Sequence, residues 1–136
     1  MRIVLVEPQH PGNIGAVART MANFGLNDLA MVKGCDLADE SYARSKSGRP
    51  VLENSKRYDT IEEAIADCGI AIGTSGIRPE GDKRWFRAPE NVEKINDIIS
   101  EREYPALLFG RENYGLYREE LALCEATITI PTNPEY

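Results

Sequence analysis

The sequence has no hydrophobic run that approaches the ~20 residues needed to cross a membrane, and its longest apolar runs have the length of strands. A signal peptide is not expected, because a short apolar segment is followed at once by Glu7 and Pro8. The three cysteines are widely separated without a C-x-x-C pair, and histidine occurs once. This pattern suggests neither a disulfide framework nor a zinc site and is typical of structural thiols in a reducing cytosol. We therefore expect a cytoplasmic protein without a bound metal.

Positive charge is also in short supply. The chain has 16 Lys and Arg residues against 22 Asp and Glu, which gives a net charge of −6 and a pI near 4.9. This balance argues against a protein that coats nucleic acid, because binding to phosphates depends on clustered cations. It leaves room for a local basic patch on an acidic body. With 136 residues, the chain is expected to form one domain, 1–136.

Short apolar runs alternate with helical patterns along the chain. The expected strands are 2–6, 28–32, 69–74, 106–110 and 126–130, with a brief strand at 51–52. The expected helices are 14–24, 40–45, 60–67, 89–102 and 119–123. Asn13 is expected to cap the first helix, Gly25 to follow its end, and 75–88 to form a loop. The alternation predicts an α/β fold with a mostly parallel sheet and helices on both faces.

Ligands in such folds gather beyond the carboxyl ends of the strands. Four of the predicted strand ends carry unusual polar residues and glycines. These are His10–Arg19, Ser75 and Gly76, Gly110–Gly115, and Pro131–Asn133. Neither G-x-G-x-x-G nor G-x-x-x-x-G-K-[ST] occurs, so neither dinucleotide binding nor P-loop chemistry is expected.

Four stretches of the chain resemble, in order and spacing, the motifs of a known family. They are HPGNIGAVARTMANFGLNDLAMV, IGTSG, LLFGRENYGL and IPTNPEY. They are similar to motifs of the SPOUT superfamily of RNA methyltransferases. Within it they most resemble the SpoU/TrmH branch and its TrmJ type, which 2′-O-methylates tRNA in the anticodon loop. The resemblance implies a trefoil-knotted, Rossmann-like α/β domain, S-adenosylmethionine as methyl donor, and a homodimer whose active sites lie at the interface.

The resemblance also implies roles for single residues. Asn13 and Arg19 match the N-x5-R of the first motif, which is the catalytic pair, and Glu112 matches the acidic residue of the second motif. The positions that match the lining of the cofactor site, largely through backbone groups, are Thr74, Ser75, Gly76, Gly110 and Ile130.

Methyl transfer to a ribose needs an aligned hydroxyl and a route for its proton. The Arg19 guanidinium can hold an RNA phosphate bidentately and so orient the ribose. Its pKa, above ~12, makes it a poor base, so positioning and electrostatic stabilisation are the favoured roles. Purely structural roles remain open. Arg19 can be an exposed helix residue, Asn13 only a helix cap, and Glu112 the partner of Arg111 or Arg118 in a surface ion pair.

The segment 78–87 combines four cations with the single tryptophan and an adjacent phenylalanine. Basic and aromatic side chains together suit RNA, through phosphate pairing and base stacking. The expected RNA-binding cations are Arg78, Lys83, Arg84 and Arg87. A surface loop with Trp85 anchored in the core or in a dimer partner explains the same residues. His10 can bind RNA or act as a base, and a role in stabilising a turn or an interface is favoured.

The family continues beyond NPEY with a Ser-Leu-Asn-Leu segment and a helix, which thread the knot and close over the cofactor. This sequence ends at Tyr136, so the third motif is half present and the knot-forming tail is absent from it. A non-catalytic module that binds S-adenosylmethionine or RNA is therefore an alternative. A flavodoxin- or Rossmann-like nucleotide-binding protein is a second, although it explains one strand end and not four.

Overall fold

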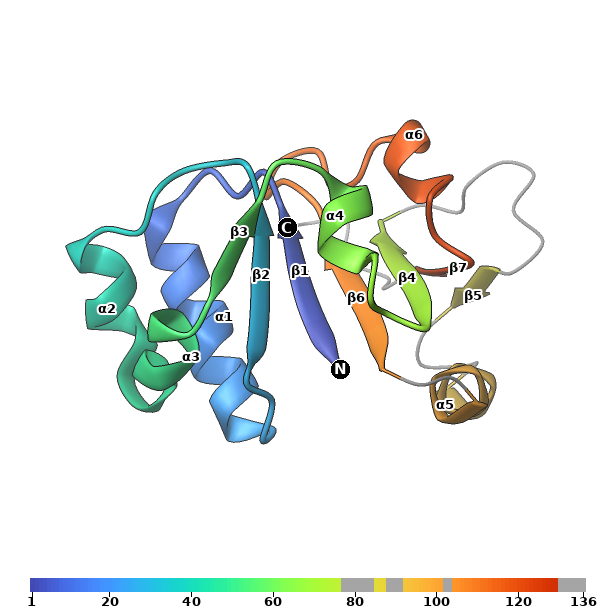
Figure 1. The fold of residues 1–136 in the computed structure, drawn as a ribbon, viewed down its shortest axis with the longest axis horizontal. Coiled ribbons are helices and arrows are strands. Elements are labelled where there is room, and N and C mark those ends of the chain that lie inside the picture. The colour runs from blue at the N-terminus through green and yellow to red at the C-terminus, as the bar shows by residue number, and fades with distance from the viewer. Residues whose placement is uncertain (77–84, 88–91, 102–103, 130–136) are drawn as a thin grey trace, which may run out of the picture.

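A computed structural model describes residues 1–76, 85–87, 92–101 and 104–129. Within these residues, seven strands form one sheet in the order β3-β2-β1-β6-β4-β7-β5, and every neighbouring pair is parallel (Figure 1). The strands are β1 (Arg2–Val6), β2 (Asp28–Val32), β3 (Lys56–Tyr58), β4 (Ile70–Ser75), β5 (Trp85–Arg87), β6 (Pro105–Phe109) and β7 (Ala126–Thr129). The predicted α/β class with a parallel sheet is confirmed.

Helices cover both faces of this sheet. They are α1 (Pro11–Asn23), α2 (Asp39–Ser45), the 3-10 turn η1 (Lys46–Gly48), α3 (Arg49–Glu53), α4 (Ile61–Ile65), α5 (Val92–Glu101) and α6 (Arg118–Leu121). Helices α1 and α3 pack on one face near β1 and β2, and α5 packs on the same face beside β4 and β7. Helices α4 and α6 pack on the other face. In the described part of the chain, no helix is both long and apolar enough to span a membrane.

Strand β1 lies near the middle of the sheet and is buried on both sides. Its side chains alternate, so Ile3 and Leu5 pack with the α1 face while Val4 and Val6 pack with the α4 face. A parallel strand covered by helices on both sides needs an uninterrupted apolar sequence. This requirement explains why the first strand is easy to recognise in the sequence.

Three details differ from the sequence-based expectations. Helix α1 begins at Pro11 with His10 as its cap, so Asn13 lies inside the first turn and is not the capping residue. The expected strand at 51–52 is part of helix α3, because Pro50 occupies the first turn, where the missing N–H of proline costs nothing. Gly25 does follow α1 with a φ of 73°, as predicted.

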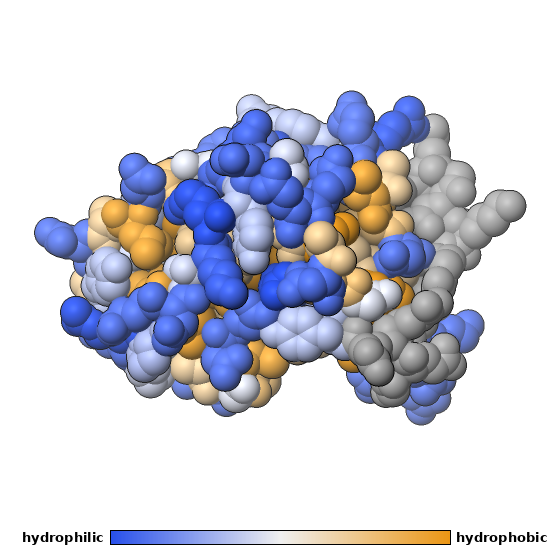
Figure 2. Space-filling view, viewed as in Figure 1, coloured by the Kyte–Doolittle hydropathy of each residue, from blue (hydrophilic) through white to orange (hydrophobic). Residues whose placement is uncertain are grey.

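Two short edge strands were missed. Strand β3 consists of Lys56, Arg57 and Tyr58, whose side chains are exposed or half-buried, so the segment has no apolar alternation to reveal it. Figure 2 shows the hydrophilic surface in this region, where β3 and α4 face the viewer. Strand β5 lies inside the segment expected to be a loop and pairs with β7.

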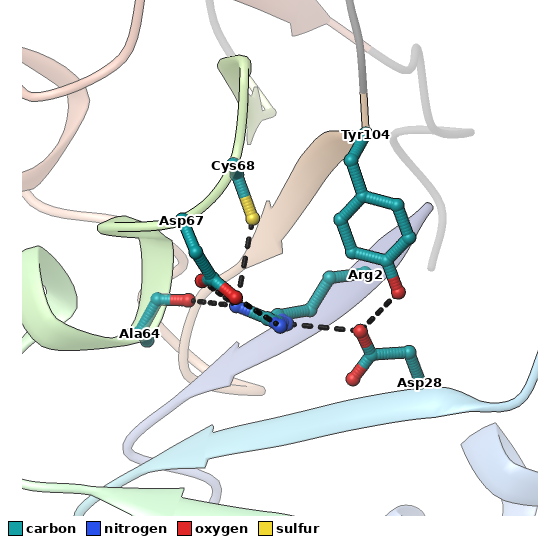
Figure 3. A network of polar contacts seen from close by, with 6 residues as sticks. All are labelled: Arg2, Asp28, Ala64, Asp67, Cys68 and Tyr104. Carbon is teal, nitrogen blue, oxygen red and sulfur yellow. Dashed lines mark hydrogen bonds and ion pairs between the residues drawn. The ribbon is translucent and has the colours of Figure 1, made fainter.

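A buried arginine ties the amino ends of the central strands together (Figure 3). Arg2 in β1 donates to Asp28 in β2 at 3.0 Å, to Asp67 at 2.6 Å and to the Ala64 carbonyl in α4 at 2.8 Å. The ring of Tyr104, just before β6, lies 5.6 Å from this guanidinium. Burial, together with a hydrogen bond to Asp28, raises the pKa of Tyr104 to about 12. This network therefore links β1, β2 and α4 at the edge of the sheet where β1 and β2 begin.

Candidate active site at the carboxyl edge of the sheet

The segments with the predicted site residues follow neighbouring strands. Strand β6 lies between β1 and β4, and β7 lies on the far side of β4, so the carboxyl ends of these four strands share one edge. The chain beyond β1 leads into α1, which carries Asn13 and Arg19. The chain beyond β6 carries Gly110 and Glu112, and Thr74 and Ser75 end β4. The fold thus gathers into one region residues that lie up to 99 positions apart in the sequence, from Asn13 to Glu112.

Arg111 holds the segment beyond β6 in shape. Its side chain is 5% exposed and makes a bidentate contact with Glu120, at 2.9 and 3.0 Å, and a second ion pair with Glu7. The guanidinium also donates to the Gly115 carbonyl and stacks on Tyr117, 3.7 Å from the ring centre. Arg111 therefore joins the end of β1, the turn beyond β6 and helix α6.

The charges of this cluster stabilise one another. The hydrogen bond with Glu120 raises the pKa of Arg111 despite its burial, so the guanidinium stays charged. Burial alone would raise the pKa of Glu120, but the bonds from Arg111 and from the Tyr117 amide outweigh it and lower that pKa. An ion pair that is both buried and fully hydrogen-bonded constrains geometry tightly. These contacts hold the segment beyond β6 against the end of β1 and against α6.

Gly110 and Glu112 lie on either side of this arginine. A Cβ on Gly110 would come within 2.0 Å of the Gly115 carbonyl carbon, so only glycine allows the turn to close. Both carboxylate oxygens of Glu112 accept from the backbone N–H of Gln9, each at 3.0 Å. Glu112 therefore bridges the chain beyond β6 to the chain beyond β1. Arg111, one of its two expected partners, binds Glu7 and Glu120 instead.

A half-open cavity of about 440 Å³ runs along α1 beside β1 and β6. Asn13, Gly110 and Glu112 line it together with a larger set of mostly apolar residues. These are Ile3, Leu5, Pro8, Ile14, Ala16, Val17, Thr20, Met21, Phe24, Leu26 and Phe109. The structure thus brings three of the predicted site residues around one hollow.

Arg19 lies on another side of the same helix. One α-helical residue turns by about 100°, so Arg19 shares its side with Gly12 and Gly15, while Asn13 lies about 120° away. The Arg19 side chain is exposed and does not line the cavity. Among the described residues it has no hydrogen-bond or ion-pair partner. Within one chain, Arg19 is therefore not brought to Asn13, Gly110 or Glu112.

The end of β4 presents mainly its backbone. Pairing with β6 ends at Gly73, whereas pairing with β7 continues to Ser75. The Thr74 hydroxyl donates to the Leu108 carbonyl at 2.9 Å, so its polar group is already used within the sheet. Gly76, the next residue, is exposed. Ligands of open α/β sheets bind beyond the carboxyl ends of the strands, and here the backbone of β4 is free of β6.

The remaining predicted site residues lie outside what the structure describes. This holds for Ile130 of the cofactor set and for Arg78, Lys83 and Arg84 of the RNA set. The backbone of Arg87 belongs to β5, opposite Thr129 of β7, but its side chain is not described. Among the described residues, no group of three or more His, Cys, Asp or Glu side chains is arranged to hold a metal ion.

The structural role of Arg111 is not evident from the sequence. The sequence suggests only an exposed pair of Arg111 with Glu112, whereas Arg111 is buried between Glu7 and Glu120. The sequence holds one faint signal, because Glu7 directly follows an apolar strand and Arg111 follows another. Opposite charges at the ends of two neighbouring parallel strands are expected to pair. The sequence does not show, however, that these two strands are neighbours in the sheet.

These features define the molecule as a parallel α/β fold in which the segments with the predicted site residues follow β1, β6 and β4. The whole chain, residues 1–136, matches the SpoU rRNA Methylase family, and the chain belongs to this family. The resemblance inferred from the four motifs is thereby confirmed.

Named relatives make the comparison more specific. The chain is 38% identical over 136 residues to the tRNA (cytidine-2′-O-)-methyltransferase TrmJ of Methanocaldococcus jannaschii, covering 98% of this chain and 59% of the relative. It is 36% identical over 137 residues to the tRNA (cytidine/uridine/adenosine-2′-O-)-methyltransferase TrmJ of Pseudomonas aeruginosa, covering 100% of this chain and 53% of the relative. The crystal structure of TrmJ from Z. mobilis ZM4 is similar, with a TM-score of 0.89 and 33% identity over 99% of this chain and 60% of that one. The chain thus spans little more than half the length of these relatives.

Proposed function

We propose that this chain is the catalytic domain, 1–136, of an S-adenosylmethionine-dependent RNA 2′-O-methyltransferase that acts on tRNA, with an anticodon-loop ribose as the target. The observation that carries the proposal is the family match over the whole chain, combined with the gathering of motif residues from β1, β6 and β4 at one edge. The activities named for the relatives favour an enzyme over a non-catalytic binding module. They also leave the flavodoxin-like alternative without support.

The end of β4 and the turn at Gly110 fit the proposed cofactor. Thr74, Ser75 and Gly76 offer backbone groups where β4 parts from β6, and Gly110 keeps the neighbouring backbone free of a side chain. These groups and Ile130 would hold S-adenosylmethionine through hydrogen bonds and close contact. When bound, the cofactor supplies a methyl group already activated by its sulfonium charge, so the protein needs no metal for activation.

The side chains around this region take complementary roles. Glu112 is fixed on the Gln9 amide and keeps the segment beyond β6 beside the start of α1. Asn13 lines the same cavity and supplies an amide that can bind the ribose or an adjacent phosphate. Arg19 is exposed and unpaired among the described residues, so it is free to hold an RNA phosphate and orient the hydroxyl for in-line attack.

The working unit is proposed to be a homodimer. One chain leaves Arg19 apart from Asn13, and the cavity along α1 is lined by apolar side chains, including Phe24, which is 76% exposed. An exposed apolar surface of this kind favours association with another protein surface. A second copy of the chain would cover the cavity and bring its own Arg19 to the shared site.

Light scattering should find a dimer, and Phe24→Ser should shift the equilibrium toward monomer. A wild-type monomer at micromolar concentration contradicts this part of the proposal.

The activity is tested with an unmodified tRNA transcript and isotopically labelled S-adenosylmethionine. We expect the label in the RNA as a 2′-O-methyl group. The methylated nucleotide is identified by mass spectrometry, and the phosphodiester bond that follows it resists alkaline cleavage. Calorimetry with S-adenosylhomocysteine measures cofactor binding separately. Binding without methyl transfer would support the module, and absence of both would reject the proposed function.

A matched pair of variants tests the role of Arg19. Arg19→Gln is expected to reduce methyl transfer at least 100-fold while leaving binding of S-adenosylhomocysteine unchanged. Lys56→Gln removes the same charge from the exposed edge strand β3 and should retain wild-type transfer. Equal effects of the two substitutions would show that only net charge matters and would exclude the role proposed for Arg19.

A further inference from the structure

One short part of this acidic protein is strongly basic. Between Ser41 and Tyr58 the chain has five Lys and Arg residues and a single carboxylate, Glu53. All five cations are exposed, and three of them come from consecutive elements of the layer beside α1. We call Arg44 of α2, Lys46 of η1 and Arg49 of α3 the α2–η1 surface.

Close packing places this surface next to Arg19. A Cβ on Gly48 would lie 2.3 Å from the Ala18 carbonyl and 2.5 Å from the Arg19 nitrogen, so η1 abuts α1 at that residue. Lys46 and Arg49 lie within two residues of Gly48 along the chain. At the other end of the contact, the Arg44 guanidinium lies 2.8 Å and the Glu40 carboxylate 2.5 Å from the position that a Gly12 Cβ would take, so one carboxylate borders the surface there. The three cations therefore lie beside the face of α1 that carries Arg19.

The charges of this surface are available to a ligand. Within the described residues, Arg44 and Lys46 have no ion-pair partner. Arg49 pairs with Glu53 at 3.1 Å, but the two side chains are 65% and 55% exposed, and such surface pairs are weak. Other arginines are committed elsewhere, since Arg2 and Arg111 are buried in ion pairs. The α2–η1 surface thus concentrates free positive charge where Arg19 also lies.

We propose that the α2–η1 surface binds backbone phosphates of the RNA substrate and so aligns the RNA along α1. This inference rests on the proposed function, which makes RNA the partner. A phosphodiester chain carries one negative charge per nucleotide, and a row of separate cations matches such a ligand better than it matches a single small anion. Contacts of this type position the RNA without reading its sequence. The surface then supplies affinity and register, while Arg19 acts at the reacting nucleotide.

A pair of double variants with equal charge provides the test. Arg44→Gln with Lys46→Asn removes two cations from the surface, and Asn tolerates the φ of 47° at position 46. Lys56→Gln with Lys94→Gln removes two cations elsewhere. Lys56 lies two residues before Tyr58 and therefore on the same face of β3, the face that packs on the α4 side. Lys94 lies on α5 at the other end of the sheet (Figure 1). Thermal unfolding followed by circular dichroism establishes that both variants fold.

The readout is the affinity for an unmodified tRNA transcript at several salt concentrations. Each lost phosphate contact reduces the slope of log affinity against log salt by ~0.7 to ~0.9. The surface variant should therefore lose ~1.4 to ~1.8 from the slope and bind at least tenfold more weakly at low salt, while the control double variant retains the wild-type slope. Equal slopes for the two double variants, or an unchanged affinity of the surface variant, would overturn the inference.

Methyl transfer by the wild-type protein separates this inference from the proposed function. An active wild type whose surface variant binds RNA normally rejects the α2–η1 surface and leaves the function intact. A wild type that transfers no methyl group rejects the function, while a reduced salt slope in the surface variant still supports the surface as an RNA contact.

Discussion

Replacing Arg111 by methionine tests the reasoning about the candidate site most directly. The substitution keeps an unbranched side chain about as long as the aliphatic part of arginine, but it leaves Glu120, which is 15% exposed, without its bidentate partner. Removing one member of a buried ion pair typically costs ~3–5 kcal/mol. Because Glu7 is 43% exposed and can be solvated again, the lower end applies, and we expect a loss of about 3 kcal/mol. For a chain of this size, such a loss lowers the melting temperature by roughly 10 °C.

Urea denaturation followed by circular dichroism measures the loss as a shift of the midpoint at constant slope. Arg49→Met is the matched control, since the Arg49–Glu53 pair is exposed and should contribute no more than ~0.5 kcal/mol.

The pH dependence of this loss in stability follows from the lowered pKa of Glu120. A depressed carboxyl pKa stabilises the fold above its ordinary value of 4.5, and that contribution is lost as the pH falls through the folded-state value. The difference between wild type and Arg111→Met should therefore shrink below pH 4.5. Equal costs for Arg111→Met and Arg49→Met would refute the structural role of Arg111.

Three further substitutions probe single contacts, each measured by urea denaturation. Tyr104→Phe removes the hydroxyl that donates to Asp28 and should cost about 1 kcal/mol, and the component that ionises near pH 12 should vanish from the absorbance titration of the tyrosines. Gly110→Ala forces a methyl group against the Gly115 backbone and should cost ~1–3 kcal/mol, with an unchanged midpoint contradicting the close approach. Thr74→Val keeps the shape but loses the bond to a β6 carbonyl, so a loss of about 1 kcal/mol is expected, and a neutral result would show that this bond is replaced by water.

The sheet was largely predictable because its strands are covered on both faces. Parallel strands buried on two sides must be apolar throughout, so β1 and β4 stand out as short hydrophobic runs. The exposed edge strand β3 has no such requirement, and its Lys-Arg-Tyr sequence matches that of a loop. The start of α1 was placed three residues late for a related reason. Its first turn, Pro11 to Asn13, is set by the fixed φ of proline and not by hydrophobic periodicity.

The candidate site was predictable only in part. The order of the motifs located the segments beyond β1, β4 and β6, and the parallel topology brings these segments to one edge. The sequence did not reveal that Arg111 would be buried, because its burial depends on Glu7 and Glu120, which are 104 and 9 residues away. Long-range pairing of this kind follows from strand order, which a one-dimensional pattern does not contain.

The spacing of the first motif has a consequence that the helix geometry makes testable. Asn13 and Arg19 are six residues apart, so they project from sides of α1 that differ by about 120°, and within one chain only Asn13 lines the cavity. If both serve one reaction, we expect Arg19 to act in the site of the other protomer. Arg19→Gln and Asn13→Ala should then each be inactive alone, whereas mixed dimers contain one intact site. Equal mixing after subunit exchange should restore about a quarter of the wild-type activity, because half of the dimers are mixed and each has one complete site. No recovery in dimers proven to be mixed would place both residues in the site of their own chain and refute the shared arrangement.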